Sequence, residues 1–328
     1  MTNQNTRITF WILLLAASGL AVICTLFSGI FSSDPVVASQ REAAAALSAV
    51  AGCVVQTDES GHVITVRARG PAFTDAVAAR LQELPDLRSL QLPDCEITNE
   101  VLEFIASLSR LERLHLNSTG VTSAGLTHLT QLSNLTELVL ADCELDDGGM
   151  KMVAQLNSLR ILNLDGTNVT DEGLEHLAAL QNIEKLYLGG TEVEGTGFAK
   201  FDSHDDLIHL SLPDTRLTEK GLSSLKNLRG LQVLYLDGVK FTAPMLQRLM
   251  DVAVESFPQL TGLFLSRTLL EDESVDTLMA LANMPGLAIV RLDETRISKQ
   301  AFLRLAKTTP DIRYMVDYPA SNDPDARD

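Results

Sequence analysis

The sequence predicts an α/β solenoid preceded by one transmembrane helix, with parallel strands on the concave side and helices on the convex side of the solenoid. Two observations predict this class. Residues 63–311 repeat one leucine-containing pattern ten times, and residues 8–31 contain no charged side chain. A period near 24 residues indicates stacked units, because each unit can bury its apolar face only against its neighbours.

The repeat is clearest in residues 159–182, which read LRILNLDGTNVTDEGLEHLAALQN. The first six residues alternate between apolar and polar side chains, which predicts a short strand. Thr170 is a residue type that caps helices, and the two acidic residues after it complement the positive end of a helix dipole. The helix then buries leucines spaced three residues apart on one face, namely Leu174, Leu177 and Leu180.

Copies of this unit begin at apolar residues along the chain: Val63, Leu87, Leu111, Leu135, Leu159, Ile183, Leu207, Leu231, Leu260 and Leu287. Most units carry Thr or Cys at the ninth place, where we expect the hydroxyl or thiol to reach backbone groups of the neighbouring turn. Cys95 and Cys143 lie two units apart, about 9–10 Å by the strand spacing. A disulfide requires Cα atoms within about 7 Å, so we expect buried, unpaired thiols.

The remaining segments divide the chain further. We predict a tail at 1–7, the span at 8–31, a linker at 32–38, an amino-terminal cap at 39–62, ten repeats at 63–311, a carboxy-terminal cap strand at 312–318 and a disordered tail at 319–328. The amino-terminal cap is expected to be a helix over 39–51 followed by a hairpin that turns at Ser60 and Gly61.

The uncharged stretch at 8–31 is long enough to cross a bilayer, because a helix needs about 20 residues for that distance. The apolar region of a cleaved signal peptide is shorter, about 7–15 residues. We therefore interpret it as an uncleaved signal anchor. Cleavage after Ala38, which would give a secreted protein, is the alternative. The short tail before the span favours a cytoplasmic amino terminus, with the repeats on the outer side of the membrane.

The TxVTDxGLxxL units, preceded by a span and a helix–hairpin cap, resemble the membrane-associated leucine-rich-repeat proteins of bacteria, typically planctomycetes. The Cys in LPDCEIT and LADCELD also resembles the cysteine-containing repeat subtype of F-box adaptors, although no F-box-like segment precedes the repeats here. The resemblance covers residues 39–318 and implies a leucine-rich-repeat solenoid. For function it implies protein interaction and no particular ligand.

The central outward position of the strands predicts a partner-binding face. Aromatic residues are sparse in this chain, yet three of them occupy this position, and aromatic residues are enriched in binding hot spots. We predict that the concave face binds a protein partner through Tyr187, Tyr235, Phe264, Asn163, Ser211 and Arg291, with Asp165 and Asp237 at its edge. An ordinary solvated sheet face with scattered aromatics is the alternative interpretation.

Other chemistries find little support in the sequence. The net charge of −17 argues against a nucleic-acid partner, and no motif for a nucleophile, a zinc protease or a phosphate loop is present. Asp202, His204, Asp205 and His209 are residue types that bind metal ions, but His209 should project from the concave side and His204 from the convex helix. We expect no metal, cofactor, small-molecule substrate or catalysis. A cell-envelope scaffold without a discrete ligand, and an enzyme using the acidic groups, are the competing functions.

If residues 8–31 anchor the chain, the protein should fractionate with membranes and resist carbonate extraction. Deletion of residues 1–33 should leave a soluble, folded repeat domain, which circular dichroism of the supernatant fraction can check. A mature protein whose amino terminus maps near Ser39 would instead establish cleavage.

Overall fold

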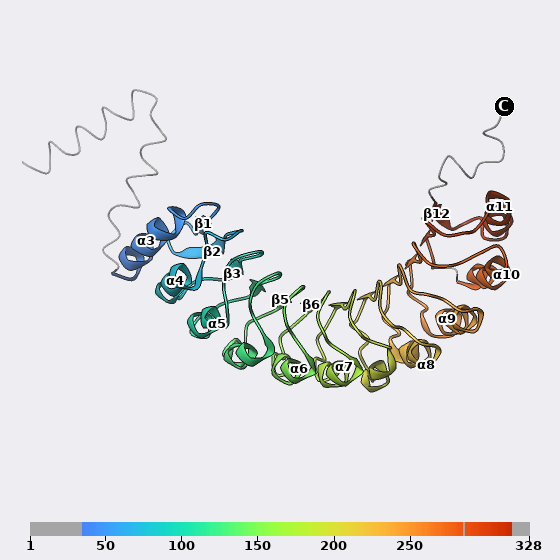
Figure 1. The fold of residues 1–328 in the computed structure, drawn as a ribbon, viewed down its shortest axis with the longest axis horizontal. Coiled ribbons are helices and arrows are strands. Elements are labelled where there is room, and N and C mark those ends of the chain that lie inside the picture. The colour runs from blue at the N-terminus through green and yellow to red at the C-terminus, as the bar shows by residue number, and fades with distance from the viewer. Residues whose placement is uncertain (1–34, 285, 317–328) are drawn as a thin grey trace, which may run out of the picture.

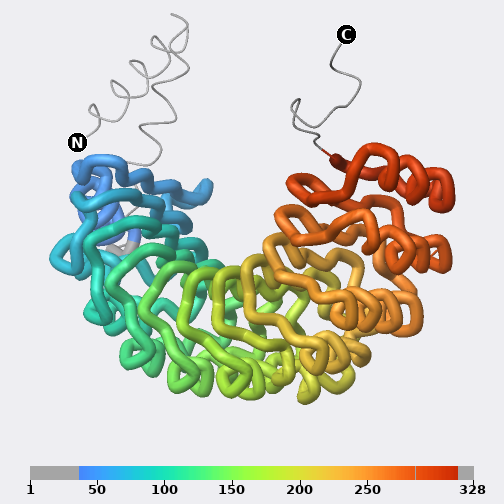
Figure 2. The backbone as a smooth tube through the Cα atoms, turned by 45° about the vertical axis from the view of Figure 1, so that its right-hand side comes forward, coloured from blue at the N-terminus to red at the C-terminus, as the bar shows by residue number. Residues whose placement is uncertain are grey.

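A computed structural model describes residues 35–284 and 286–316, and these form a curved solenoid. Figure 1 shows the strands lining the inside of the arc and the helices lying along its outside. The strands make one sheet in chain order from β1 to β12, antiparallel between β1 and β2 and parallel elsewhere. The two ends of the described chain lie at opposite tips of the arc (Figure 2). The predicted α/β solenoid is thereby confirmed for the described residues.

The strands are mostly three residues long: β1 Val54–Thr57, β2 Val63–Arg67, β3 Ser89–Gln91, β4 Arg113–His115, β5 Glu137–Val139, β6 Ile161–Asn163, β7 Lys185–Tyr187, β8 His209–Ser211, β9 Val233–Tyr235, β10 Gly262–Phe264, β11 Ile289–Arg291 and β12 Arg313–Met315. The α-helices are α3 Pro35–Ser48, α4 Asp75–Ala78, α5 Glu100–Ile105, α6 Asp147–Val153, α7 Asp171–Leu177, α8 Glu219–Ser224, α9 Ala243–Ser256, α10 Ser274–Leu278 and α11 Lys299–Thr308. Tighter 3₁₀ turns complete the outer layer: η2 Ala79–Glu83, η3 Ser123–Gln131, η4 Thr196–Lys200, η5 Leu225–Asn227 and η6 Met279–Asn283.

The core is a continuous aliphatic layer between the strands and the helices. In the unit at 159–182 the predicted inward residues are all buried: Leu162, Leu164, Leu174, Leu177 and Leu180. Thr170 also caps α7 as predicted, because its hydroxyl accepts the Glu172 N–H at 3.2 Å. The leucine spacing therefore identified both buried faces of the unit.

The ninth residue of the unit acts differently from our expectation. The hydroxyl of Thr167 donates to the carbonyl of Leu164 in its own unit at 2.6 Å, and Thr191 does the same with Leu188. Cys143 does reach the neighbouring turn, because its Sγ lies 3.2 Å from the carbonyl of Leu116, whereas Cys95 Sγ lies 3.6 Å from the carbonyl of Pro93 in its own unit. Threonine at this place closes the turn after its own strand, because the same carbonyl accepts both its hydroxyl and its backbone N–H.

Neighbouring units are joined by the acidic residue that begins many of the helices. Both carboxylate oxygens of Asp147 accept hydrogen bonds from the next capping residue, Thr170, from its N–H at 2.8 Å and its hydroxyl at 2.7 Å. Asp75 binds Thr98 in the same way at 3.1 and 2.9 Å. The sequence indicated only a helix-dipole role for these acids, whereas the structure shows that they also link one unit to the next.

A second link between units comes from the backbone. From the second unit onward the eighth residue has a φ of 54° to 73°, whether it is glycine, as at Gly166, or a residue such as Asp142 or Arg267. This left-handed conformation aims its N–H at the following turn, so that Asp142 donates to Asp165 at 2.8 Å. Glycine adopts the conformation without steric cost, and aspartate tolerates it.

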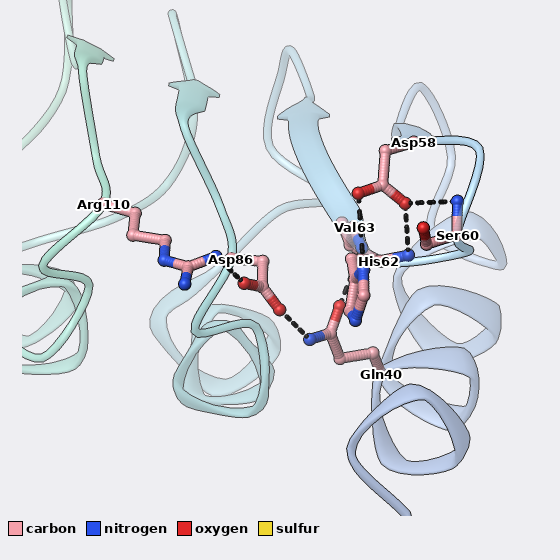
Figure 3. Close-up of polar contacts among 7 residues, drawn as sticks. All are labelled: Gln40, Asp58, Ser60, His62, Val63, Asp86 and Arg110. Atoms are coloured by element: carbon pink, nitrogen blue, oxygen red, sulfur yellow. Dashed lines mark hydrogen bonds and ion pairs between the residues drawn. The ribbon is translucent and has the colours of Figure 1, made fainter. Parts of the chain in front are cut away.

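The amino-terminal cap is tied to the solenoid through one buried amide (Figure 3). Gln40 of α3 accepts the N–H of Val63 at 2.7 Å and donates to Asp86 at 2.8 Å, and Asp86 in turn pairs with Arg110. The side chain of Gln40 is fully buried, so the loss of either bond would leave a polar group without water. Where the sequence predicted a helix over 39–51, the structure has α3 over Pro35–Ser48.

The hairpin of the cap turns where predicted. The carboxylate of Asp58 accepts the N–H groups of Ser60 and His62, each at 2.9 Å, and Gly61 has a φ of 90°. The backbone hydrogen bond from His62 is the largest cause that lowers the pKa of Asp58. At the other end β12 pairs with β11 and leaves Met315 exposed.

No described helix is long and apolar enough to cross a membrane. The predicted span at 8–31, the tail at 1–7 and the tail at 319–328 lie outside the described residues.

Replacement of Leu177 by alanine should lower the free energy of unfolding by about 2–5 kcal/mol, because a fully buried leucine loses its contacts and leaves a cavity. The matched control Glu175→Ala, on the exposed side of the same helix, should change it by less than about 0.5 kcal/mol. Urea unfolding of both variants checks the contrast. The pair Leu129→Ala and Thr127→Ala should behave alike, and equal stabilities within either pair would contradict the register.

Candidate functional site

The concave face presents two columns of outward side chains, because each strand turns its first and third residues away from the core. In β7 and β8 the register pairs Lys185 with His209 and Tyr187 with Ser211. The parallel pairing continues without a shift from β2 to β12, so equivalent residues of successive units stand side by side.

Four rings form a continuous ladder across the middle of this face. Tyr187 and His209 have ring centroids 4.9 Å apart, and His209 and Tyr235 lie 5.1 Å apart. Tyr235 stacks on Phe264 at 4.2 Å with an interplanar angle of 17°. The rings cross from β7 to β10, and each is half-buried. We call Tyr187, His209, Tyr235 and Phe264 the aromatic ladder.

Small residues beneath the rings permit this arrangement. A Cβ atom at Gly262 would lie 3.0 Å from Cε2 of Phe264, so a larger residue there would push that ring away. Ser211 lies on β8, between the strands of Tyr187 and Tyr235, and is 7% exposed. Direct contact of Ser211 with a partner stays a prediction, and little of its side chain reaches the surface in this structure.

The three predicted aromatic residues are half-buried, although they occupy outward strand positions. Tyr187, Tyr235 and Phe264 each contact another ring of the ladder, so part of each ring is covered. Burial raises the pKa of Tyr187, with further contributions from Tyr235, Asp165 and Glu137. A partner would therefore contact the ladder mainly at its ring edges and hydroxyls.

His209 is the least satisfied member of the ladder. Its Nε2 is buried and has no hydrogen-bond partner among the described residues. Burial lowers the pKa of His209, and the nearby ammonium of Lys185 lowers it further. Burial and the charge of Lys185 therefore both favour the neutral imidazole.

The predicted acidic edge is partly structural. Asp165 accepts the N–H of Gly189 in the next unit, and Asp237 accepts that of Ser266 at 2.9 Å. Asn163 accepts the N–H of Asp165 at 2.8 Å. Burial raises the pKa of Asp165. These side chains hold the turns beside the ladder, so charge removal there would disturb the scaffold as well as a contact.

Arg291 stands at the end of the ladder, next to Phe264 in the register. Its guanidinium pairs with Asp293 two residues later, and its side chain remains 45% exposed. Of the predicted residues, the structure thus brings Tyr187, Tyr235, Phe264 and Arg291 into one surface.

Of the residues considered as metal ligands, His204 is part of the packing, whereas Asp202 and Asp205 are exposed. His204 is buried against Phe201 at a ring distance of 4.6 Å, and its Nδ1 lies 3.2 Å from the carbonyl of Asp202. The described residues contain no group of three or more potential metal ligands. Cys95 and Cys143 are buried and free, as predicted, and burial raises the pKa of Cys95 to about 11.

Sequence reasoning missed His209 and Gly262 as parts of the site. It considered only the central outward position, whereas both residues occupy the first outward position of their strands. The signal was available, because the two positions alternate along each strand and their side chains meet across neighbouring strands.

His204 occupies the place of a core leucine, and burial lowers its pKa. Because its folded-state pKa lies below the ordinary value of about 6.5, the unfolded chain takes up the proton first as the pH falls. Stability from His204 is thus complete above pH 6.5 and declines as the pH falls toward the lowered value. His204→Leu should reduce this decline, measured by urea unfolding at pH 7.5 and pH 5. An unchanged pH dependence would mean that His204 is readily protonated in the folded chain.

Comparison with known proteins agrees with the geometry. The family model described as "Leucine Rich repeat" matches residues 131–154 and 155–178. Among curated proteins none matches the sequence. An internalin (inlF) of Listeria monocytogenes is similar with 17% identity and a TM-score of 0.45, covering 87% of this chain and 95% of its own. Internalin C2 of the same organism has 22% identity and a TM-score of 0.43, covering 62% and 93%. The family match and the observed sheet together show leucine-rich repeats arranged as an α/β solenoid.

Proposed function

We propose that this protein is a membrane-anchored, non-catalytic module that binds a protein partner on the concave face of its solenoid. The observation that carries the proposal is the aromatic ladder on β7 to β10. Four rings gathered on one concave surface are costly to leave against water, in a chain with only 5% aromatic residues. Rings held by their neighbours lose little entropy when a partner covers them, which favours binding.

Anchoring is proposed from residues 8–31, with the amino terminus in the cytoplasm and the repeats on the outer side of the membrane. Cleavage of this segment would turn the same module into a secreted one. The support is the length of the uncharged stretch and the short tail before it.

The shape of the site favours a protein partner over a small substrate. Tyr235 stacks on Phe264 and packs against the tilted ring of His209, so less flat surface remains for a planar ligand or a sugar. Cavities of about 180 Å³ and 300 Å³ lie elsewhere, between α9 and α10 and beside the end of α11. Their linings contain no imidazole or thiol that could act with the nearby carboxylates.

A photo-crosslinking amino acid in place of Tyr235 should capture a discrete partner in native membranes. The same amino acid in place of Glu175, exposed on the convex side, is the matched control and should capture little. Crosslinking is preferable to truncation, because replacement of Tyr235 by serine would also remove its stacking on Phe264. Gel shifts and mass spectrometry of the crosslinked species provide the measurement.

The competing functions predict different outcomes. Equal capture from both positions would move the binding surface away from the concave strands. If neither position yields a discrete species, a cell-envelope scaffold without a specific ligand would be favoured.

A further inference from the structure

The concave strands carry a charge opposite to that of the whole chain. The chain has a net charge of −17. Among the outward residues of β2 to β12, the basic ones are Arg67, Arg113, Lys185, Arg291 and Arg313. The only acidic residue among them is Glu137. The face that holds the aromatic ladder is therefore a basic strip on an acidic protein.

Most of these cations lack an internal counter-charge. Among the described residues, no carboxylate forms an ion pair with Arg67, Arg113, Lys185 or Arg313. Arg113 reaches only the hydroxyl of Ser89, at 3.5 Å. The single acid, Glu137, is instead bonded to His115 Nε2 at 2.9 Å.

The neighbouring edge of the sheet shows the opposite pattern. There, one residue before the first outward position, Arg160 pairs with Glu184 of the next unit, and Arg88 lies 3.6 Å from Glu112. Ion pairs between neighbouring units can therefore form in this repeat. The outward strand residues nevertheless form few of them.

Lys185 links this charge to the aromatic ladder. It lies on β7 two residues before Tyr187, and the register places it next to His209. It is half-buried, and its ammonium lies near enough to His209 to lower the pKa of that imidazole. An anionic group that approaches the ladder would meet this ammonium in a partly desolvated setting, where a charge pair is stronger than in bulk water.

We infer that the protein partner of the concave face presents carboxylates beside apolar side chains, the apolar groups against the aromatic ladder and a carboxylate against Lys185. This inference rests on the proposed function. The net charge and the carboxylates of Asp165 and Asp237 would by themselves favour a basic partner, but both carboxylates already accept backbone N–H groups. The charge of the concave strands, which the partner contacts, determines which partner charge is favoured. The net charge of the whole chain matters less for this contact.

A nucleic acid would also seek basic and aromatic residues on a sheet, but the geometry disfavours it. Bases bind such surfaces by stacking on exposed ring faces, and the faces of Tyr235 and Phe264 are stacked on each other. The charge of −17 would also repel a polyanion outside the strip.

The test uses the purified full-length chain and two fluorescein-labelled peptides. One peptide alternates glutamate and leucine over twelve residues, and its twin carries lysine in place of each glutamate. Fluorescence anisotropy should show binding of the acidic peptide at least about tenfold tighter than that of the twin. Lys185→Glu should weaken it by about fivefold to tenfold. Lys151→Glu, the same charge change on an exposed residue of α6, should alter it less than about twofold.

Each other outcome has a definite meaning. If the acidic peptide has no advantage, whether both peptides bind or neither does, the inference is overturned. Equal effects of Lys185→Glu and Lys151→Glu would also overturn it, since only overall charge would then matter. Tighter binding of an oligothymidylate, sensitive to Lys185→Glu, would replace the protein partner by a nucleic acid. A preference for the basic twin that is lost in Tyr235→Leu would leave the proposed function standing and remove only this inference.

Discussion

Each unit of this solenoid can bury its leucines only between the units on either side, and the rest of the structure depends on that constraint. Leu162 and Leu177 are covered because neighbouring turns repeat the same positions. The links between turns follow the same logic. Asp147 bonds to Thr170 of the next unit, and the left-handed residue Asp142 sends its N–H to Asp165. At the amino-terminal end, where no earlier unit exists, α3 supplies the missing cover and Gln40 ties it to the first strand.

The same stacking produces the candidate site. Because the strands pair without a shift, outward residues of successive units lie about 4.8 Å apart, a distance at which rings can touch. Tyr187, His209, Tyr235 and Phe264 meet for this reason, although they come from four units. Residues that are one repeat apart in the sequence therefore become neighbours on one continuous surface. Substitutions at these outward positions change that surface with little effect on the leucine core.

Charged side chains also follow the repeat, because equivalent positions of neighbouring units lie side by side. Many ion pairs join equivalent positions of neighbouring units, such as Arg160 with Glu184 and Arg216 with Glu192. These exposed pairs contribute little individually, but they neutralise much of the outer surface and the sheet edge. The outward strand residues Arg113 and Lys185 are without such partners among the described residues. The basic strip and the aromatic ladder thus occupy the same side of the molecule, which is why we assign recognition to it.

The sequence by itself determined the repeat, its register and the core, because leucines at fixed spacing report burial directly. It also located Tyr187, Tyr235 and Phe264 on the concave side, since strand alternation is a local property. Only the tertiary structure decided which side chains touch. It placed His209 among the rings and buried Ser211 between their strands, and it engaged Asp165 and Asp237 with backbone groups of the next turn. The physical reason is that these contacts form between units, where side-chain size, ring orientation and free N–H groups of two different turns must fit together.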